Sequence, residues 1–341
     1  MIVTNLRSSS VNTYKYCPMS YFLEYNLGWD SGINKAAIKG TIVHHVLEIL
    51  ALLKKADQNG NGSIKILEKE LLRDDYLETD KNIEKLTDWL YDIHFERYNN
   101  KGLVWKDADR QDCRKWVQKT LTQWNQQFDP RIRHIIDAEK FFEFEILKPW
   151  ASYCYELADG SKLQGCLKLF GTIDLVTQLE NEYYEMIDWK TGKNRDWNKG
   201  TDKTAEDVKN DIQPRMYHYV MSQQYPATRI TITLLHINDG GPISIYFDES
   251  DVAQTEKLIQ HYFETIKTSQ PICNKSWRCS KWCEFGKTTF ENTSITPLIR
   301  NTPLTKCQQT EYVLQFKDMN TVVANMCNGS FLDNLKAYHQ G

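Results

Sequence analysis

Residues 169–193, LFGTIDLVTQLENEYYEMIDWKTGK, decide the fold. Two runs rich in β-branched, aromatic and other apolar residues flank the polar stretch Glu180-Asn181-Glu182, a pattern that predicts an antiparallel hairpin. The first run carries one acid, Asp174, between Ile173 and Leu175. Burying a carboxylate in such surroundings is costly unless a cation or a hydrogen-bond donor compensates its charge.

The second run ends in Asp188-Trp189-Lys190. Alternate side chains of a strand share a face, so Asp188 and Lys190 lie on one face and Trp189 on the other. Two carboxylates and an ammonium on one hairpin fit a bound divalent ion that prefers oxygen ligands, Mg²⁺ or Mn²⁺, and such ions commonly assist phosphoryl transfer. By themselves these residues fit a salt-bridged strand end equally well.

The spacing of these residues matches a known signature. Asp174 followed by Asp188-x-Lys190 resembles the motif of the PD-(D/E)XK nuclease superfamily, and the sequence DWKTG at residues 188–192 is typical of its RecB-like branch. Two other segments resemble motifs of that branch. The first is Q-x-x-x-Y within DIQPRMY at 211–217, and the second is G-x-x-x-H-x-x-x-E within KGTIVHHVLE at 39–48. The motifs follow the family's order and reach over most of residues 1–290.

This resemblance implies a fold and an activity. The fold is α/β, with the mixed β-sheet core of restriction-endonuclease-like proteins flanked by helices. The activity is that of a Mg²⁺- or Mn²⁺-dependent DNA exonuclease, which hydrolyses phosphodiester bonds of DNA ends or single strands in replication, recombination or repair. A compact stand-alone chain of this kind is typical of phages and mobile elements.

The resemblance also implies roles for individual residues. Lys190 positions the attacking water or stabilises developing charge, while Gln213 and Tyr217, which a helix presents on one face, orient Lys190 or touch the DNA backbone. The implied catalytic set is Asp174, Asp188, Lys190, Gln213 and Tyr217. The implied metal ligands are His44, Asp174, Asp188, the backbone carbonyl of Trp189 and, through water, Glu139.

Each of these residues also has an ordinary structural interpretation. A helical histidine such as His44 is usually a satisfied core or surface residue, and only its distance from Gly40 distinguishes it from His45. Tyr217 could be one more aromatic side chain packed on a sheet. Glu139 could be an exposed strand end.

The cysteines form a separate pattern. The segment YCPMSYFLEY at 16–25 resembles the opening of RecB-type and CRISPR-associated exonucleases, in which one N-terminal and three C-terminal cysteines hold a [4Fe–4S] cluster. The resemblance implies Cys17, Cys273, Cys279 and Cys283 as ligands. The C-terminal spacing departs from the family, because Thr289 stands where its last cysteine is usual. Zinc or unmetallated thiols therefore stay open as alternatives.

Composition limits the other properties. Nine cysteines without a signal-peptide profile at the N-terminus predict a cytoplasmic protein with free or metal-bound thiols, and five of these cysteines show no useful spacing. No apolar run is long enough to predict a membrane span. The net charge of −3 excludes general adhesion to DNA, so contact needs a local basic groove. One candidate is the segment 190–215, whose seven cations meet five acids; a solvated mixed-charge loop is the alternative.

Periodicity predicts the order of elements. Helices are expected from about residue 8, over 39–54, within an insertion at 64–128, around 213–217 and over 252–268. Strands are expected at 139–147, in the hairpin at 169–190, and at 228–238 paired with 243–247. Residues 1–290 form the predicted nuclease domain, closed by the cysteine segments at its two ends, and 291–341 form a C-terminal extension.

Two rival functions follow from the same residues. One is a CRISPR-adaptation nuclease with a partner integrase, and the other is a non-catalytic DNA-binding subunit. The intact set of Asp174, Asp188 and Lys190 argues against the second. No G-x-x-x-x-G-K-[ST] loop is present, so any unwinding requires a helicase or recombination partner.

Overall fold

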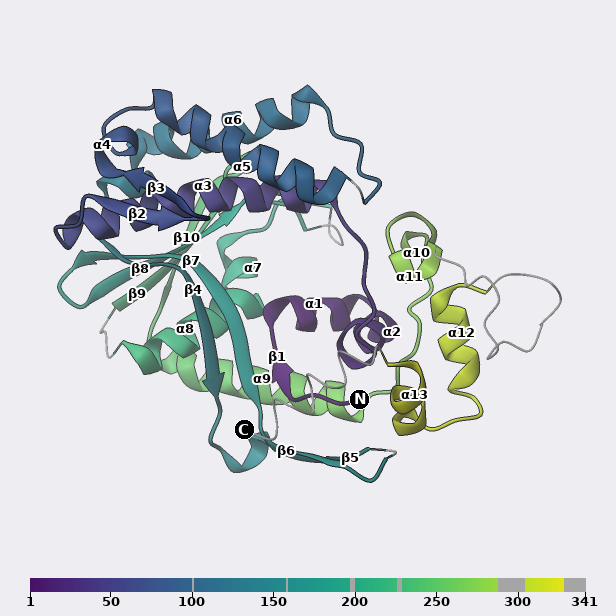
Figure 1. Cartoon of the computed structure of the whole chain (residues 1–341). Coiled ribbons are helices and arrows are strands. Elements are labelled where there is room, and N and C mark those ends of the chain that lie inside the picture. The colour runs from purple at the N-terminus through teal and green to yellow at the C-terminus, as the bar shows by residue number, and fades with distance from the viewer. Residues whose placement is uncertain (100, 158, 197–199, 226–228, 288–303, 328–341) are drawn as a thin grey trace. The chain divides into compact units, whose positions relative to one another are not determined.

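A mixed β-sheet organises the fold (Figure 1). The computed structural model describes residues 1–99, 101–157, 159–196, 200–225, 229–287 and 304–327. Within them the sheet has the order β1 (Asn5–Leu6), β7 (Lys168–Glu180), β8 (Tyr183–Lys190), β9 (Arg229–His236) and β10 (Gly241–Phe247), and β4 (Ile135–Glu145) also pairs with β7. The predicted α/β fold with a central mixed sheet is confirmed.

The strand pairings place the central motif. β7 and β8 form the predicted antiparallel hairpin, in which Leu175 pairs with Ile187. β8 and β9 run parallel, and Lys190 pairs with His236. Parallel neighbours need a crossover connection, and α7 (Ala205–Lys209) and α8 (Ile212–Gln224) lie in that connection. β9 and β10 form the second predicted hairpin.

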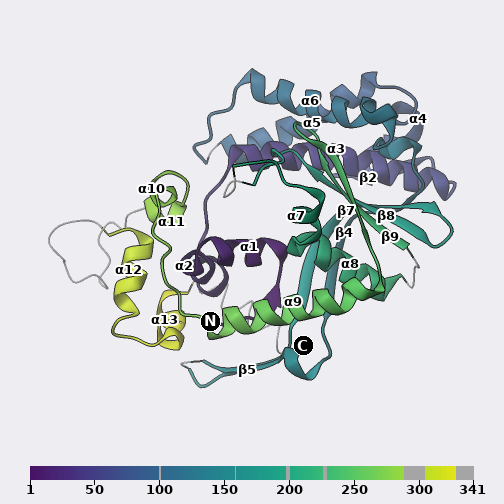
Figure 2. The same cartoon turned by 180° about the vertical axis from the view of Figure 1, so that it is seen from behind.

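The chain divides into two compact units, and the central motif belongs to the unit formed by residues 33–142 and 172–254. Its helices α3 (Lys35–Gln58), α5 (Lys81–Asn99) and α6 (Asp107–Thr122) lie over one face of the sheet, and α8 lies over the other (Figure 2). The core joins buried side chains of α3 to Leu175, Ile187 and Trp189 of the hairpin. Asp188 and Lys190 alternate with Trp189 along β8, so burial of Trp189 turns them to the opposite face.

Helix α3 corrects one expectation. It is long and apolar enough to pass the length and hydropathy test for a membrane span, although no such run was predicted. The apolar stretch of α3 is 56% buried inside the protein, and nine of the helix's residues, among them Ile42, Val46 and Leu50, belong to the hydrophobic core. The apolar length of α3 is therefore explained by packing within the fold.

Three segments differ from the predicted elements. A hairpin of β2 (Ser63–Ile66) and β3 (Lys69–Leu72) precedes α4 (Arg73–Tyr76) and the predicted helices of the insertion. A second unpredicted hairpin, β5 (Ser152–Glu156) and β6 (Lys162–Cys166), lies between β4 and β7. β4 begins at Ile135, so Glu139 lies inside the strand and not at its start. Short 3₁₀ turns occupy Trp124–Gln126, Pro130–Ile132 and Pro149–Ala151.

The other unit contains residues 1–32, 143–171 and 255–341. Cys17 separates α1 (Ser8–Tyr16) from α2 (Pro18–Tyr21), which continues into a π-helix at Phe22–Asn26. The helix predicted over 252–268 is α9 (Glu249–Thr268), and its residues from Thr255 onward belong to this unit. The remaining helices are α10 (Arg278–Lys281), α11 (Glu284–Lys287), α12 (Lys306–Val313) and α13 (Met319–Met326). Residues 288–303 and 328–341 of the predicted extension lie outside the described residues.

Candidate metal-dependent active site

A single glycine sets the position of α3 beside the hairpin. A β-carbon on Gly40 would lie 2.8 Å from Oγ1 of Thr191, the residue that follows β8. The absence of a side chain at Gly40 therefore lets the helix approach the end of this strand. His44 lies four residues further along the same helix face and meets the acids of the sheet.

His44, Glu139 and Asp174 form a compact group of potential ligands. The Nδ1 atom of His44 lies 3.5 Å from Asp174 Oδ1 and 3.9 Å from Glu139 Oε1, and the three ligand atoms all lie within 4.8 Å of one another. They line a cavity of about 320 Å³ together with Thr41, His45 and Glu48. One imidazole nitrogen and two carboxylates are a donor set that suits a divalent metal ion.

Glu139 reaches this group through an irregular backbone. Its φ of +44° lies in the left-handed region, which a non-glycine residue in a strand rarely adopts. Such a conformation costs free energy and is found preferentially at functional sites. Burial and the nearby carboxylate of Asp174 raise the pKa of Glu139 to about 8, even though His44 opposes the shift.

Asp174 is held by the strand beside it. Its Oδ2 atom accepts a hydrogen bond of 2.7 Å from the backbone N–H of Trp189. This fixes one carboxylate oxygen and leaves the other, Oδ1, directed at His44. The indole of Trp189 is fully buried, with the His44 ring edge-on to it at 5.8 Å.

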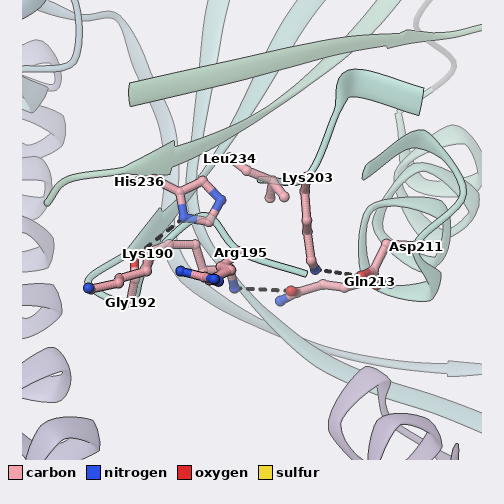
Figure 3. A pocket seen from close by; sticks show the side chains of 9 residues that line it. Lys190, Gly192, Arg195, Lys203, Asp211, Gln213, Leu234 and His236 are labelled. Carbon is pink, nitrogen blue, oxygen red and sulfur yellow. Dashed lines mark hydrogen bonds and ion pairs between the residues drawn. The ribbon is translucent and has the colours of Figure 1, made fainter. Parts of the chain in front are cut away.

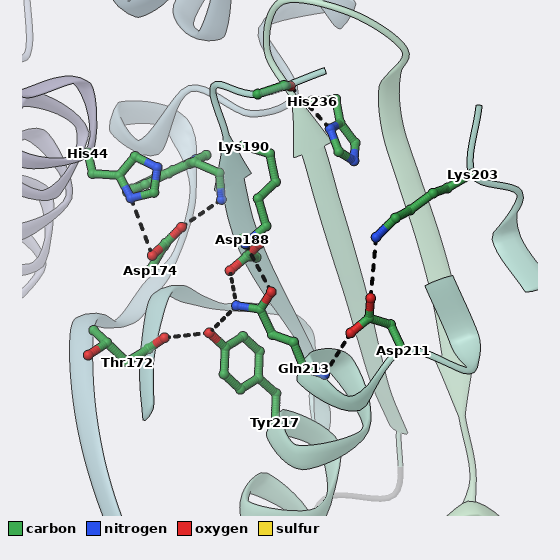
Figure 4. Close-up of polar contacts among 12 residues, drawn as sticks. His44, Thr172, Asp174, Asp188, Lys190, Lys203, Asp211, Gln213, Tyr217 and His236 are labelled. Atoms are coloured by element: carbon green, nitrogen blue, oxygen red, sulfur yellow. Dashed lines mark hydrogen bonds and ion pairs between the residues drawn. The ribbon is translucent and has the colours of Figure 1, made fainter. Parts of the chain in front are cut away.

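Asp188, Lys190, Gln213 and Tyr217 are joined in one hydrogen-bonded chain (Figure 4). The ammonium of Lys190 forms an ion pair with Asp188 and donates to Gln213 Oε1 at 3.0 Å. The Gln213 amide nitrogen donates to Asp188 Oδ1 at 3.1 Å and to the Tyr217 hydroxyl at 2.8 Å. That hydroxyl donates to the carbonyl of Thr172 on β7 at 2.7 Å, so the chain ends on the strand that carries Asp174.

Burial and neighbouring charges shift the pKa values of His44, Asp188 and Lys190 in opposite directions. Burial disfavours protonation of His44, but Asp174, Asp188 and Glu139 outweigh it and raise the pKa of His44 to about 9. Burial raises the pKa of Asp188, and the ammonium of Lys190 works against that shift. Burial would lower the pKa of Lys190, but Asp188 and Asp174 reverse the effect and keep its ammonium charged. Several carboxylates thus compete for few cations, which a divalent ion would relieve.

The predicted site residues therefore lie in two adjoining sets within one unit. Of the predicted ligands, His44, Glu139 and Asp174 belong to the compact group, whereas the Asp188 carboxylate is directed at Lys190 and Gln213. The backbone N–H of Trp189 donates to Asp174, and metal binding by the backbone carbonyl of Trp189 stays a prediction. Sequence reasoning missed Thr172, which contributes only a backbone carbonyl, and Glu48, which lines the cavity. The motif G-x-x-x-H-x-x-x-E contains Glu48 and was the available signal for it.

A second group of potential ligands lies in the other unit. The thiol of Cys273 lies near those of Cys17, Cys279 and Cys307, and the thiol of Cys307 lies near that of Cys283, because these groups shift one another's pKa values. Hydrogen bonds from Cys17 and Cys307 lower the pKa of Cys273, and one from Cys307 lowers the pKa of Cys283. Lowered pKa values favour thiolates, the form in which cysteine binds metals.

Backbone N–H groups also donate hydrogen bonds to two of these sulfurs. The N–H of Asn274 donates to Cys17 Sγ and that of Ser276 to Cys279 Sγ, both at 3.4 Å. Cys307, on α12, was expected to be one of the cysteines without useful spacing. It instead joins the four cysteines that the resemblance implied. No regular spacing could have indicated it, because residues 288–303 separate it from the nearest cysteine segment.

Comparison with known proteins agrees with the geometry. The family profile of the PD-(D/E)XK nuclease superfamily matches residues 7–287, and the chain belongs to this superfamily. Its members are metal-dependent nucleases. Twelve solved chains match, among them one from Eubacterium rectale described as a "Putative exonuclease". That chain is 12% identical, with a TM-score of 0.47, and the match covers 88% of this chain and 94% of that one. No curated protein matches.

Proposed function

We propose that the protein is a Mg²⁺- or Mn²⁺-dependent DNA exonuclease of the RecB-like branch, acting on DNA ends or single strands. The observation that carries the proposal is the contact network that joins Asp188, Lys190 and Gln213 beside the group of His44, Glu139 and Asp174. Cleavage of a phosphodiester needs charge neutralisation at the phosphate and a positioned water. The two sets of residues match these two requirements.

The compact group would hold the ion, with Asp188 next to it. A divalent ion bound there supplies positive charge to the phosphate and makes a water more acidic. The raised pKa values of His44 and Glu139, about 9 and about 8, mark a place where negative charge exceeds its compensation. The residues present therefore fit a divalent metal ion, which nucleases of the superfamily use.

Lys190 would act through its charge and not as a base. Its ammonium stays protonated because Asp188 and Asp174 raise its pKa. Gln213 holds the ammonium from one side and Asp188 from the other, so its position is fixed before substrate arrives. A fixed ammonium of this kind stabilises negative charge that develops on a phosphate.

Gln213 and Tyr217 would be positioning residues. The amide oxygen of Gln213 accepts a hydrogen bond from Lys190, and its amide nitrogen donates to Asp188 and Tyr217. The Tyr217 hydroxyl then ties the amide to the Thr172 carbonyl. The polar atoms of Gln213 and Tyr217 are thus engaged within the site, which supports a role in orienting Lys190 and Asp188 over direct contact with DNA.

A cleavage assay tests the proposal. Labelled single- and double-stranded DNA, with free or blocked ends, is incubated with Mg²⁺ or Mn²⁺. We expect terminal degradation that end blocking stops and that falls by roughly 10²-fold or more in Asp188→Asn and in Lys190→Gln. Lys65→Gln, an exposed lysine on β2, is the matched control and keeps wild-type activity. Equal degradation by all variants would mean a contaminating nuclease and would defeat the site assignment, while cleavage of blocked or circular DNA would indicate an endonuclease.

We further propose that the cysteine group holds a [4Fe–4S] cluster, with Cys307 as one ligand. A [4Fe–4S] cluster is usually held by cysteine thiolates alone, and the described thiols of this group supply such a ligand set. The resemblance of residues 16–25 to exonucleases that carry such a cluster favours it over zinc.

Metal analysis of anaerobically purified protein tests this second proposal. We expect bound iron with visible absorbance, and loss of both in Cys307→Ser. Cys154→Ser, an exposed cysteine on β5, is the matched control and retains iron. Stoichiometric zinc, or a preparation with neither metal, would contradict the cluster. Full iron in Cys307→Ser would remove Cys307 from the ligand set.

A further inference from the structure

A second pocket lies on the other side of Lys190. It has a volume of about 290 Å³ and is lined by residues of the 190–203 segment, the start of α8 and β9 (Figure 3). Lys190, Lys193, Arg195 and Lys203 bring four cationic side chains to it, against one carboxylate, that of Asp211. We call this the cationic pocket.

The pocket separates the basic segment 190–215 into two parts. Lys209 and Arg215 do not line it; both form ion pairs with Asp251, at 3.2 Å and 3.8 Å. Lys199 lies outside the described residues. Within the pocket Lys190 is paired with Asp188, and Lys203 with Asp211 at 3.3 Å. Lys193 adds a charge beyond these pairs, and Arg195, which donates to the Gly200 carbonyl at 3.0 Å, also lines the pocket, so cations outnumber carboxylates among its described residues.

His236 gives the pocket a buried polar group. Its ring lies beside Lys190 on the same face of the sheet, because the two residues pair in register on β9 and β8. Its Nδ1 atom contacts the Gly192 carbonyl at 3.5 Å. Its Nε2 atom is buried and has no hydrogen-bond partner among the described residues, although His236 is only 7% exposed. A buried polar atom without a partner is costly, and a ligand in the pocket could supply one.

We infer that the cationic pocket binds a second phosphate of the nucleic-acid strand, adjacent to the phosphate that is cleaved. The inference rests on the proposed function. Among the described residues, the pocket is lined by cationic side chains and by no aromatic one apart from His236, which favours a phosphate over a stacked base. Gly192 offers open space where a β-carbon would otherwise stand, so the strand can approach the backbone there.

Lys190 connects the two sites. It lines the cationic pocket and also holds Asp188, which neighbours the compact ligand group. Successive phosphates of one strand could therefore engage the two sides of the same lysine. Binding of the second phosphate would fix the register of the strand relative to the candidate metal site.

The salt dependence of DNA binding tests this inference. Labelled single-stranded DNA is titrated in EDTA, so that no strand is cut, over a series of KCl concentrations. Each phosphate contact on a single strand contributes about 0.7 to the slope of log K against log salt. We expect Lys193→Gln to lower this slope by about 0.7, the contribution of one phosphate. The control Lys65→Gln removes the same charge on β2, outside the pocket, and leaves the slope unchanged.

Three oligonucleotides identify the source of the phosphate. They carry a 5′-phosphate, a 3′-phosphate or hydroxyl groups at both ends. A slope change that needs one terminal phosphate supports recognition of that end, and a change of equal size with all three supports an internal phosphate. Equal slopes for the pocket variant and its control on all three would overturn the inference. DNA cleavage by the wild-type protein is scored separately, so failure of the nuclease proposal is distinguishable from failure of the pocket.

Discussion

Gly40 and Thr191 touch where the helix bearing His44 passes the end of the strand bearing Asp188 and Lys190. A β-carbon at position 40 would lie 2.8 Å from the Thr191 hydroxyl oxygen, closer than real β-carbons approach such an atom. Either Thr191 or the helix would have to move. The glycine of the G-x-x-x-H stretch is thus a spacing residue for the site.

Substituting this glycine should separate stability from activity. Alanine is a better helix former than glycine by about 1 kcal/mol, which offsets part of the overpacking cost of about 1–3 kcal/mol, so Gly40→Ala is expected to stay folded with a small loss of stability by thermal melting. It should nevertheless reduce DNA cleavage, because His44 moves away from Asp174. Gly62→Ala, where the added carbon meets open space, is the control. Restored cleavage in Gly40→Ala/Thr191→Ala would support the steric cause, and unimpaired cleavage in Gly40→Ala would contradict it.

Metal addition should stabilise the protein through the compact ligand group. A ligand that binds only the folded state at 100 times its dissociation constant adds about 2.7 kcal/mol to the free energy of unfolding. We therefore expect Mn²⁺ to raise the melting temperature of the wild-type protein and EDTA to reverse the rise. His44→Ala and Asp174→Asn should lose most of this increase, whereas Asp92→Asn, half-exposed on α5, should keep it. An undiminished rise in both site variants would place the ion elsewhere.

The metal-free protein should become less stable as the pH rises from about 5 to 9. Glu139 has a folded pKa of about 8, above its ordinary 4.5, so the folded state binds more protons than the unfolded state between these values. His44, raised from 6.5 to about 9, gives stability that is present below pH 6.5 and lost through pH 9. Both effects have the same sign. Urea unfolding in EDTA at several pH values measures them.

The matching variants sharpen this pH prediction. Glu139→Gln removes a carboxylate that burial disfavours, so it should flatten the pH dependence and stabilise the metal-free protein near pH 9. The same variant should weaken stabilisation by Mn²⁺. A wild-type stability that rises toward pH 9 in EDTA would contradict the environment described for Glu139.

Removing the Tyr217 hydroxyl should lower turnover without weakening DNA binding. Tyr217→Phe leaves the Thr172 carbonyl and the Gln213 amide without this partner, a loss of about 1–3 kcal/mol when the group is buried. We expect the rate of cleavage to fall and the dissociation constant for DNA in EDTA to stay unchanged. Tyr246→Phe, half-exposed on β10, is the control. Weaker binding with an unchanged rate would instead indicate direct contact between Tyr217 and DNA.

Local periodicity predicted much of the fold and of the site. The alternation around Trp189 places Asp188 and Lys190 on one face, and helical spacing brings Gln213 and Tyr217 together. Both depend on residues close in sequence, where geometry follows from strand and helix repeats. The hairpins and the helix that carries His44 are confirmed for the same reason.

Long-range features were beyond such patterns. The left-handed backbone of Glu139 is imposed by tertiary surroundings, since glutamate has no intrinsic preference for it. Cys307 joins the other cysteines through folding of a distant segment. The basic segment looked like a mixed-charge loop because sequence cannot show that Asp251 takes up Lys209 and Arg215.

In the proposed mechanism, the fixed ammonium of Lys190 has a consequence for the energetics of phosphodiester hydrolysis. Asp188 and Gln213 already hold it, so less water has to be rearranged around it as the phosphate becomes more negative. The work of orienting that charge is done once, while the chain folds, and is not repeated in every turnover. The contacts that orient Lys190 thereby contribute both to the stability of the native state and, in the proposed mechanism, to the rate of hydrolysis.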